Sequence, residues 1–89
     1  MNRSRRKDLG RAIDLLSRIK SDFEEAKGIV EQAASGERDY YDNMPENMQS
    51  GDKGSDADNA ATQLEEVVQS LEEFDLDDLV SKIDDARGQ

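Results

Sequence analysis

Apolar side chains recur every three or four residues through the first third of the chain, which is the spacing of an amphipathic helix. With Leu9 at the first core position of a heptad repeat, the predicted core line comprises Leu9, Ala12, Leu16, Ile19, Phe23, Ala26, Val30 and Ala33. Three more apolar residues flank this line, namely Ile13, Leu15 and Ile29. The spacing predicts one helix over about residues 4–35, with Ser4 as the N-cap and Gly36 at the C-terminal stop.

The last third of the chain repeats this helical spacing. Its predicted core line comprises Ala57, Ala60, Leu64, Val67, Leu71 and Phe74, with support from Ala61 and Val68. After Phe74 the phase slips, and the apolar side continues through Leu76, Leu79, Ile83 and Ala86. Asp75 and Asp78 have the spacing to cap a new segment there. We expect a nearly continuous helix over about residues 56–87, and a kink near residue 75 is the alternative.

Residues 36–55 carry several helix-breaking signals. Three glycines punctuate the segment and Pro45 lies at its centre, so a single continuous helix is excluded. Four of its side chains are too apolar for a solvated linker, namely Tyr40, Tyr41, Met44 and Met48. We expect an ordered first half packed over one end of the helices, then a flexible tip over residues 50–54 and an N-cap at Ser55.

The predicted fold class is all-α, with two long antiparallel helices that form a helical hairpin and a single domain over residues 1–89. The first twenty residues hold seven of the twelve basic residues and two of the twenty-two acidic ones, a net charge of +5 against −15 for the rest. Basic residues at a helix start and acidic residues at a helix end oppose the helix dipole. An antiparallel pair sets the basic start beside the acidic residues 75–85, so each unfavourable end gains a partner.

The chain is short for a self-sufficient core, because it has 89 residues of which 34% are apolar and 38% charged. A lone hairpin leaves part of each apolar stripe in water, in particular Ile13, Leu15, Ile29, Val68 and Leu76. We therefore predict a homo-oligomer, with a dimer favoured, that completes a helical bundle. Binding in the groove of a partner protein is the alternative.

The composition gives little support for catalysis. The chain has neither cysteine nor histidine, so the usual pairs of nucleophile and base are missing. Asp52, Asp56 and Asp58 resemble the start of a calcium loop, but Ala57 and Gln63 stand where glycine and glutamate are needed. We expect no enzyme activity, no metal site and no cofactor. No apolar run is long enough to cross a bilayer, so we expect a cytoplasmic chain that does not enter a membrane.

Acidic residues form rows on the predicted outward faces of both helices. These are Glu24, Glu25 and Glu31 in the first helix, and Glu65, Glu66, Glu72 and Glu73 in the second. Such rows are common on solvated helix faces, and they could also imitate a phosphate backbone and bind a basic protein surface. The basic arm comprises Arg3, Arg5, Arg6, Lys7 and Arg11. A net charge of −10 and the lack of interleaved aromatic residues disfavour its direct binding to nucleic acid.

Residues 40–49, with the sequence YYDNMPENMQ, resemble a recurrent segment of small helical proteins from bacteriophages and related mobile elements. The resemblance implies a phage setting, in the cytoplasm of a host cell, and a helical hairpin, and it carries over no active site. This chain departs from the regular acidic and aliphatic repeats of those proteins after Phe74. Small acidic phage proteins often act by stoichiometric binding, including inhibition of host defence.

The expected function is that of a non-enzymatic accessory protein that binds another protein, such as a host nucleic-acid-handling or defence protein with a basic surface. The alternatives are a self-assembling helical scaffold protein and a nucleic-acid-binding factor that uses the basic arm. The predicted partner-binding residues are Tyr40, Tyr41, Met44, Met48, Glu65, Glu66, Glu72 and Glu73. The competing interpretation of the tyrosine and methionine group is that it closes the open end of the hairpin.

Overall fold

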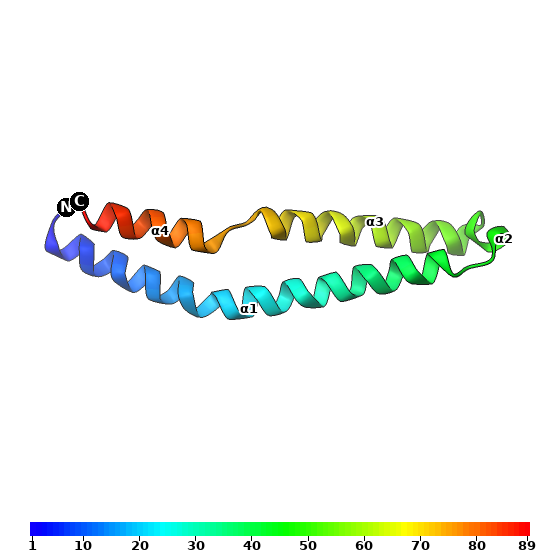
Figure 1. Ribbon diagram of the computed structural model, residues 1–89, viewed down its shortest axis with the longest axis horizontal. Helices are drawn as coiled ribbons and strands as arrows, with labels where there is room; N and C mark the ends of the chain where they lie inside the picture. The colour runs from blue at the N-terminus through cyan, green and yellow to red at the C-terminus, as the bar shows by residue number, and fades with distance from the viewer. The chain divides into compact units, whose positions relative to one another are not determined.

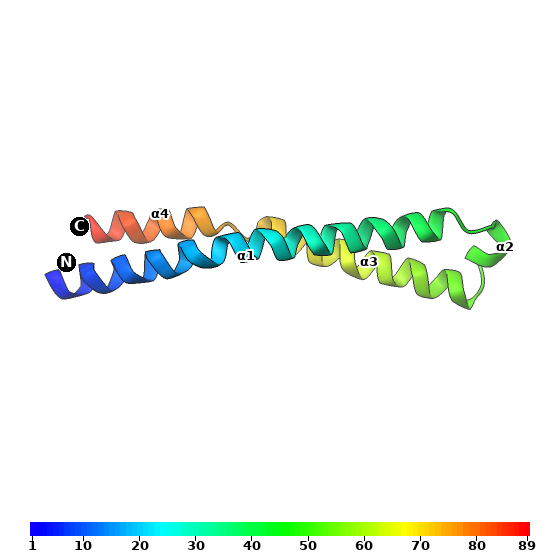
Figure 2. The same cartoon turned by 90° about the horizontal axis from the view of Figure 1, so that it is seen from below.

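A computed structural model describes residues 1–89 and shows four helices and no strand. The helices are α1 (Arg3–Asp42), α2 (Glu46–Gln49), α3 (Asp52–Glu73) and α4 (Leu76–Arg87) (Figure 1). They form two compact units: unit 1 contains Met1–Glu25 and Phe74–Gln89, and unit 2 contains Ala26–Glu73. In unit 1 the start of α1 lies antiparallel to α4, and in unit 2 the rest of α1 lies antiparallel to α3 (Figures 1 and 2). The predicted all-α helical hairpin is confirmed.

Helix α1 is longer than predicted and ends at Asp42 instead of residue 35. The Oδ1 atom of Asn2 accepts a hydrogen bond from the backbone N–H of Arg5 at 2.8 Å, so Asn2 and not Ser4 caps the helix. Gly36 lies inside the helix and has no left-handed backbone conformation, so the predicted stop is wrong. Contacts from Arg38 to α3 stabilise the turns beyond Gly36 and offset the low helix propensity of glycine.

The segment predicted as a flexible tip is largely helical. Helix α3 begins at Asp52, and Ser55 donates its backbone N–H to the carbonyl oxygen of Gly51 at 2.9 Å, so the predicted N-cap at Ser55 is wrong. Gly54 is buried where α3 meets α2, and a Cβ atom there would lie 2.5 Å from the carbonyl oxygen of Met48. Because that contact is with backbone, only glycine fits this close approach.

The second long helix is interrupted at Phe74 and Asp75, where α3 ends and α4 begins. Asp75 has an extended backbone, with φ −107° and ψ 95°, and its Oδ1 atom accepts a hydrogen bond from the N–H of Asp78 at 3.0 Å. The favoured prediction of a nearly continuous helix is wrong, and the alternative of a break near residue 75 is right. The phase slip after Phe74 was the sequence signal of this break.

In each of α1, α3 and α4, the residues that are covered by the facing helix form a different line from the predicted one. The covered or partly covered lines recur mostly at steps of four and three, with a gap at the exposed Lys20: Leu9, Ile13, Leu16, Phe23, Lys27, Val30, Ala34, Arg38 and Tyr41 in α1; Ala57, Ala61, Leu64, Val68 and Leu71 in α3; Leu76, Val80, Ile83 and Arg87 in α4. Ala12 and Ala60 of the predicted line are partly covered. The other residues three positions on are exposed: Ile19, Ala26, Ala33, Val67, Phe74, Leu79 and Ala86. About half of each predicted core line is therefore right, and we call the line that is covered in the structure the seam.

Small side chains explain which line is covered in unit 2. Ala34, Ala57 and Ala61 are buried, and Ala61 is 0% exposed. Alanine at these positions lets the backbones of α1 and α3 approach closely, so the helices pack along this line. In unit 1 the rings of Phe23 and Phe74 lie with their centroids 5.4 Å apart at an interplanar angle of 56°, and Leu76 is buried.

Candidate functional site

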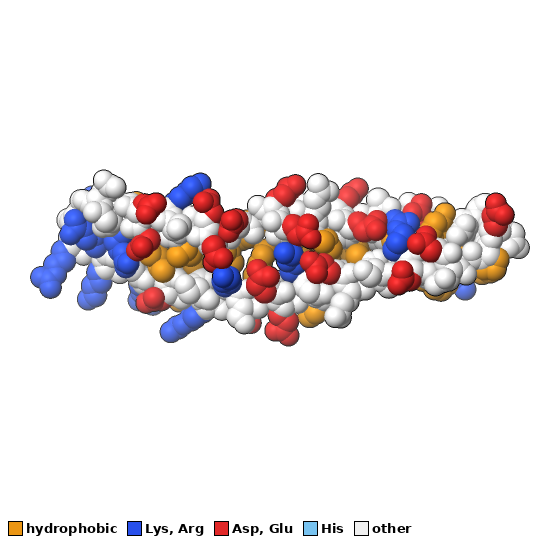
Figure 3. Space-filling view, in the orientation of Figure 1, with side chains coloured by type: hydrophobic (Ala, Val, Ile, Leu, Met, Phe, Trp, Pro, Cys, Tyr) orange, Lys and Arg blue, Asp and Glu red, His pale blue; other side chains and the backbone are white.

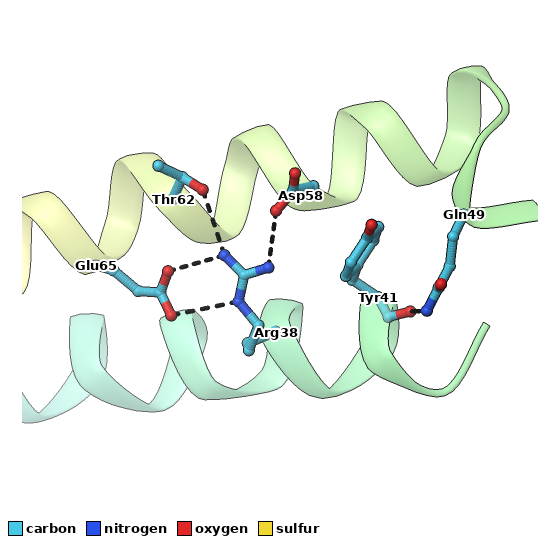
Figure 4. A network of polar contacts seen from close by, with 6 residues as sticks. All are labelled: Arg38, Tyr41, Gln49, Asp58, Thr62 and Glu65. Atoms are coloured by element: carbon cyan, nitrogen blue, oxygen red, sulfur yellow. Dashed lines mark hydrogen bonds and ion pairs between the residues drawn. The ribbon is translucent and has the colours of Figure 1, made fainter. Parts of the chain in front are cut away.

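Arg38 of α1 is the centre of a polar network that joins α1 to α3 in unit 2 (Figure 4). Its Nη1 atom donates to Oδ1 of Asp58 at 2.7 Å. Its Nη2 and Nε atoms donate to the two carboxylate oxygens of Glu65 at 2.8 and 3.3 Å, and Nη2 also lies 3.3 Å from Oγ1 of Thr62. This bidentate contact fixes the register of the two helices, because the planar guanidinium matches a carboxylate in one orientation.

The network changes the titration of both partners. Hydrogen bonds from Arg38 lower the pKa of Glu65, and the same bonds, with that to Asp58, raise the pKa of Arg38. Glu65 was predicted as a member of an acidic partner-binding row, but its carboxylate is engaged within the chain. The other predicted members in α3, Glu66, Glu72 and Glu73, are exposed.

The tyrosine and methionine group divides into structural and exposed members. Met44 is 8% exposed, and the Tyr41 ring lies under the Arg38 guanidinium at 5.7 Å from its centroid. The Nε2 atom of Gln49 donates to the carbonyl oxygen of Tyr41 at 2.9 Å and satisfies a carbonyl group at the end of α1 (Figure 4). Met44 and Tyr41 therefore close this end of unit 2, whereas Tyr40 and Met48 remain exposed.

A largely exposed apolar face lies on the other side of unit 2 from Arg38. Val67 follows Glu65 by two residues and Tyr40 follows Arg38 by two, which at about 100° per residue turns each to the far side of its helix. We define the apolar face of unit 2 by five residues: Ile29, Ala33, Tyr40, Ala60 and Val67. Ile29 is 61% exposed, Tyr40 49% and Val67 46%. Sequence spacing identified Val67 and Ala33 as apolar positions but placed them in the core.

Acidic residues dominate the charge of unit 2. Its 48 residues contain three basic and twelve acidic side chains, a net charge of −9, whereas unit 1 has nine basic and ten acidic side chains, a net charge of −1. Red acidic side chains predominate along α3 in Figure 3, and blue basic ones gather at the start of α1. The whole-chain charge of −10 is therefore concentrated in unit 2.

Unit 1 carries the basic arm and its own exposed apolar residues. Lys20 donates to the carboxylate of Asp77 at 2.8 and 2.9 Å, and this contact raises the pKa of Lys20. It provides one of the predicted ion pairs between the basic start and the acidic end. Arg5, Arg6 and Lys7 form no ion pair with α4. The exposed large apolar side chains of unit 1 include Leu15, Ile19, Phe74 and Leu79.

The structure brings together no group of three acidic side chains that could hold a metal ion. The groove beside Arg38, of about 430 Å³, is lined by the paired Arg38 and Glu65 and by Glu31 and Asp39, which have no ion pair in the structure. None of the helices combines the length and the apolar character needed to span a bilayer.

Comparisons with protein-family models, curated proteins and solved structures find no match to this chain. Its functional interpretation therefore depends on the residues and contacts described above.

Proposed function

We propose that this chain is a non-enzymatic accessory protein that acts by stoichiometric binding of another protein. The observation that carries the proposal is that large apolar side chains stay exposed in both units, with Ile29 and Val67 in unit 2 and Leu15 in unit 1. Groups of large exposed apolar side chains mark protein interaction sites in soluble chains. The resemblance of residues 40–49 to phage proteins favours a bacteriophage setting, and a host nucleic-acid-handling or defence protein is the proposed target.

The small amount of burial supports the same proposal. The chain exposes 6679 Å² of accessible surface, against about 5,200 Å² expected for a folded monomer of this mass. Its buried apolar residues are three alanines, one methionine and one leucine, and no large side chain is fully buried. A partner that covers the exposed apolar side chains adds the contacts that the chain lacks by itself.

Affinity capture tests the proposal. The immobilised chain is incubated with bacterial lysate, and the retained complex is measured for stoichiometry by size exclusion and mass spectrometry. We expect one protein at a fixed ratio with the wild-type chain and with Gln69→Ala, and its loss with the double variant Leu15→Gln, Ile29→Gln. Equal retention by all three chains, or no retained protein, would contradict stoichiometric binding through the exposed apolar side chains.

Self-assembly into a dimeric or larger helical scaffold is the second candidate function. The observation in its favour is the exposed apolar set of unit 1, which is nearly neutral at a net charge of −1 and so opposes self-association little. Sedimentation equilibrium of the isolated chain measures this directly. A concentration-dependent oligomer that Leu15→Gln dissociates supports the second candidate, and a monomer at all concentrations excludes it.

A further inference from the structure

We infer that the apolar face of unit 2 is the docking surface for a basic amphipathic helix of another protein. The inference rests on the proposed function, because it names the surface and the chemistry of the partner. The face consists of Ile29, Ala33, Tyr40, Ala60 and Val67, as defined above, and it lies across α1 and α3 from the Arg38 network.

The register of unit 2 makes this face continuous across the two helices. Thr62 lies level with Arg38 through their contact. Because the helices are antiparallel, a step forward along α3 matches a step back along α1. Val67 is five residues after Thr62 and Ala33 is five before Arg38, so these two lie level. Ala60 is two residues before Thr62 and Tyr40 is two after Arg38, so these two also lie level. The apolar side chains of α1 and α3 therefore form one surface between the helices instead of two separate lines.

The charges around the face select the partner. Asp39 and Glu66 immediately precede Tyr40 and Val67 in the sequence and are exposed, and α3 has no basic residue from Gly54 to its end at Glu73. Unit 2 has only three basic residues to set against these acidic ones: Arg38 pairs with Asp58 and Glu65, Lys27 is partly covered where α1 packs on α3, and Lys53 is exposed in the first turn of α3.

A second copy of this chain is a poor occupant of the face. Docking two such faces together would bring two units of net charge −9 into contact, and the exposed Lys53, two helical turns before Ala60, is too little to offset the repulsion. A partner with lysine or arginine beside its apolar stripe gains from the same charges. The charge of unit 2 therefore favours a basic partner over self-association at this surface.

The spacing of the face fits a helix. Ile29 and Tyr40 are eleven residues apart in α1, which is about 16 Å along the helix axis, or three turns of a partner helix. A third helix packed in the shallow groove between two antiparallel helices buries apolar residues at steps of three and four. The expected partner segment has this apolar spacing with basic residues on both sides of the stripe.

A designed peptide tests the inference without knowledge of the natural partner. The probe is a peptide of about three heptads with leucine at positions a and d and lysine at e and g, and its control has glutamate in place of each lysine. Isothermal titration calorimetry measures their binding to the full chain at low and high salt. We expect the lysine peptide to bind one-to-one with an affinity that falls with salt, and the glutamate peptide not to bind.

Variants of the chain test whether the peptide binds the apolar face or is only attracted by the negative charge of unit 2. Ile29→Gln and Val67→Gln should each weaken binding of the lysine peptide about tenfold, because each removes an apolar side chain that the peptide covers. Leu15→Gln makes the same change in unit 1 and should alter binding less than about twofold. Circular dichroism checks that all three variants keep the wild-type helix content.

Three outcomes would overturn the inference. Peptide binding that Ile29→Gln and Val67→Gln leave unchanged would show attraction by charge alone. Self-association of the chain that Val67→Gln abolishes and Leu15→Gln does not would make a second copy the occupant. Lysate capture lost with Leu15→Gln but kept with Ile29→Gln would refute this surface and leave the proposed function standing, whereas capture unaffected by both would refute the proposed function.

Discussion

Val67 and Val68 are neighbours in α3, yet Val68 is partly covered in the seam with α1 while Val67 is 46% exposed on the apolar face of unit 2. Val68 lines the groove beside Arg38 together with Ala34 of α1. Two chemically identical residues therefore differ only in which side of the helix they occupy. This pair therefore gives a direct test of which residues of α3 form the seam with α1.

Val68→Ala should destabilise the chain by about 1 kcal/mol more than Val67→Ala. Both changes gain the same helix propensity, so the difference reports the apolar contacts that Val68 makes across the seam. Urea unfolding of the two variants, followed by circular dichroism, measures it. Equal midpoints would mean that the two side chains are buried to the same extent, which contradicts the seam.

Glu65→Gln should lower stability at neutral pH, because the amide loses the charge-assisted contact with Arg38. The contact lowers the pKa of Glu65 below its ordinary value of 4.5, so its contribution is complete above that pH and disappears as the pH falls through the lower, folded-state pKa. Thermal unfolding of the wild type and of Glu65→Gln should therefore converge as the solution is acidified below pH 4.5.

Glu66→Gln is the matched control for this pH dependence. It removes the same charge from the adjacent exposed position, where the structure has no ion pair to break. A stability difference of the same size and pH dependence in both variants would attribute the effect to the net charge of unit 2 and not to Arg38.

Gly54→Ala should destabilise the chain by about 1 to 3 kcal/mol. The added Cβ atom meets the backbone of Met48 and Gln49, which cannot move without displacing α2 from α3. Gly28→Ala is the control, because a Cβ atom there meets nothing within 4 Å and alanine favours helix by about 1 kcal/mol. The two substitutions should thus change the melting temperature in opposite directions. A stabilised Gly54→Ala variant would show that α2 does not pack closely on α3.

Asp75→Ala should destabilise the chain by about 1 kcal/mol, because it removes the side-chain acceptor for the N–H of Asp78 at the start of α4. Asp75→Asn keeps an acceptor at this position and should retain most of the stability. Chemical shifts of residues 75–79 in NMR spectra report the break between the helices directly. Continuous helical shifts from α3 through α4 in the wild type would contradict it.

Much of the fold was predictable because it depends on local rules. The three- and four-residue spacing predicted two helical stretches, and the change of phase after Phe74 marked the position of the break. Helix ends were less predictable. Gly36 is a common stop signal, but Arg38 beyond it contacts α3, and those contacts form only after the chain has folded back.

The candidate site was predictable only in part. Tyr40 and Met48 are exposed as a binding role requires, whereas Met44 is buried, Tyr41 lies under Arg38, and Glu65 pairs with Arg38. The sequence contains no local signal for the pairing of Arg38 with Asp58 and Glu65, because these residues lie 20 and 27 positions apart. The exposure of Ile29 in the proposed docking face was predicted from the sequence, whereas Ala33 and Val67 were placed in the core and are exposed in the structure.

By itself, the sequence determined that this chain forms amphipathic helices, where proline interrupts them, and that its acidic residues concentrate after the first twenty positions. Those properties follow from backbone conformation and composition, which act over a few residues. Only the tertiary structure decided which flank of each helix is covered, because both flanks are apolar and the choice depends on how closely Ala34, Ala57 and Ala61 let the backbones approach. That choice leaves Ile29, Tyr40 and Val67 exposed on one face.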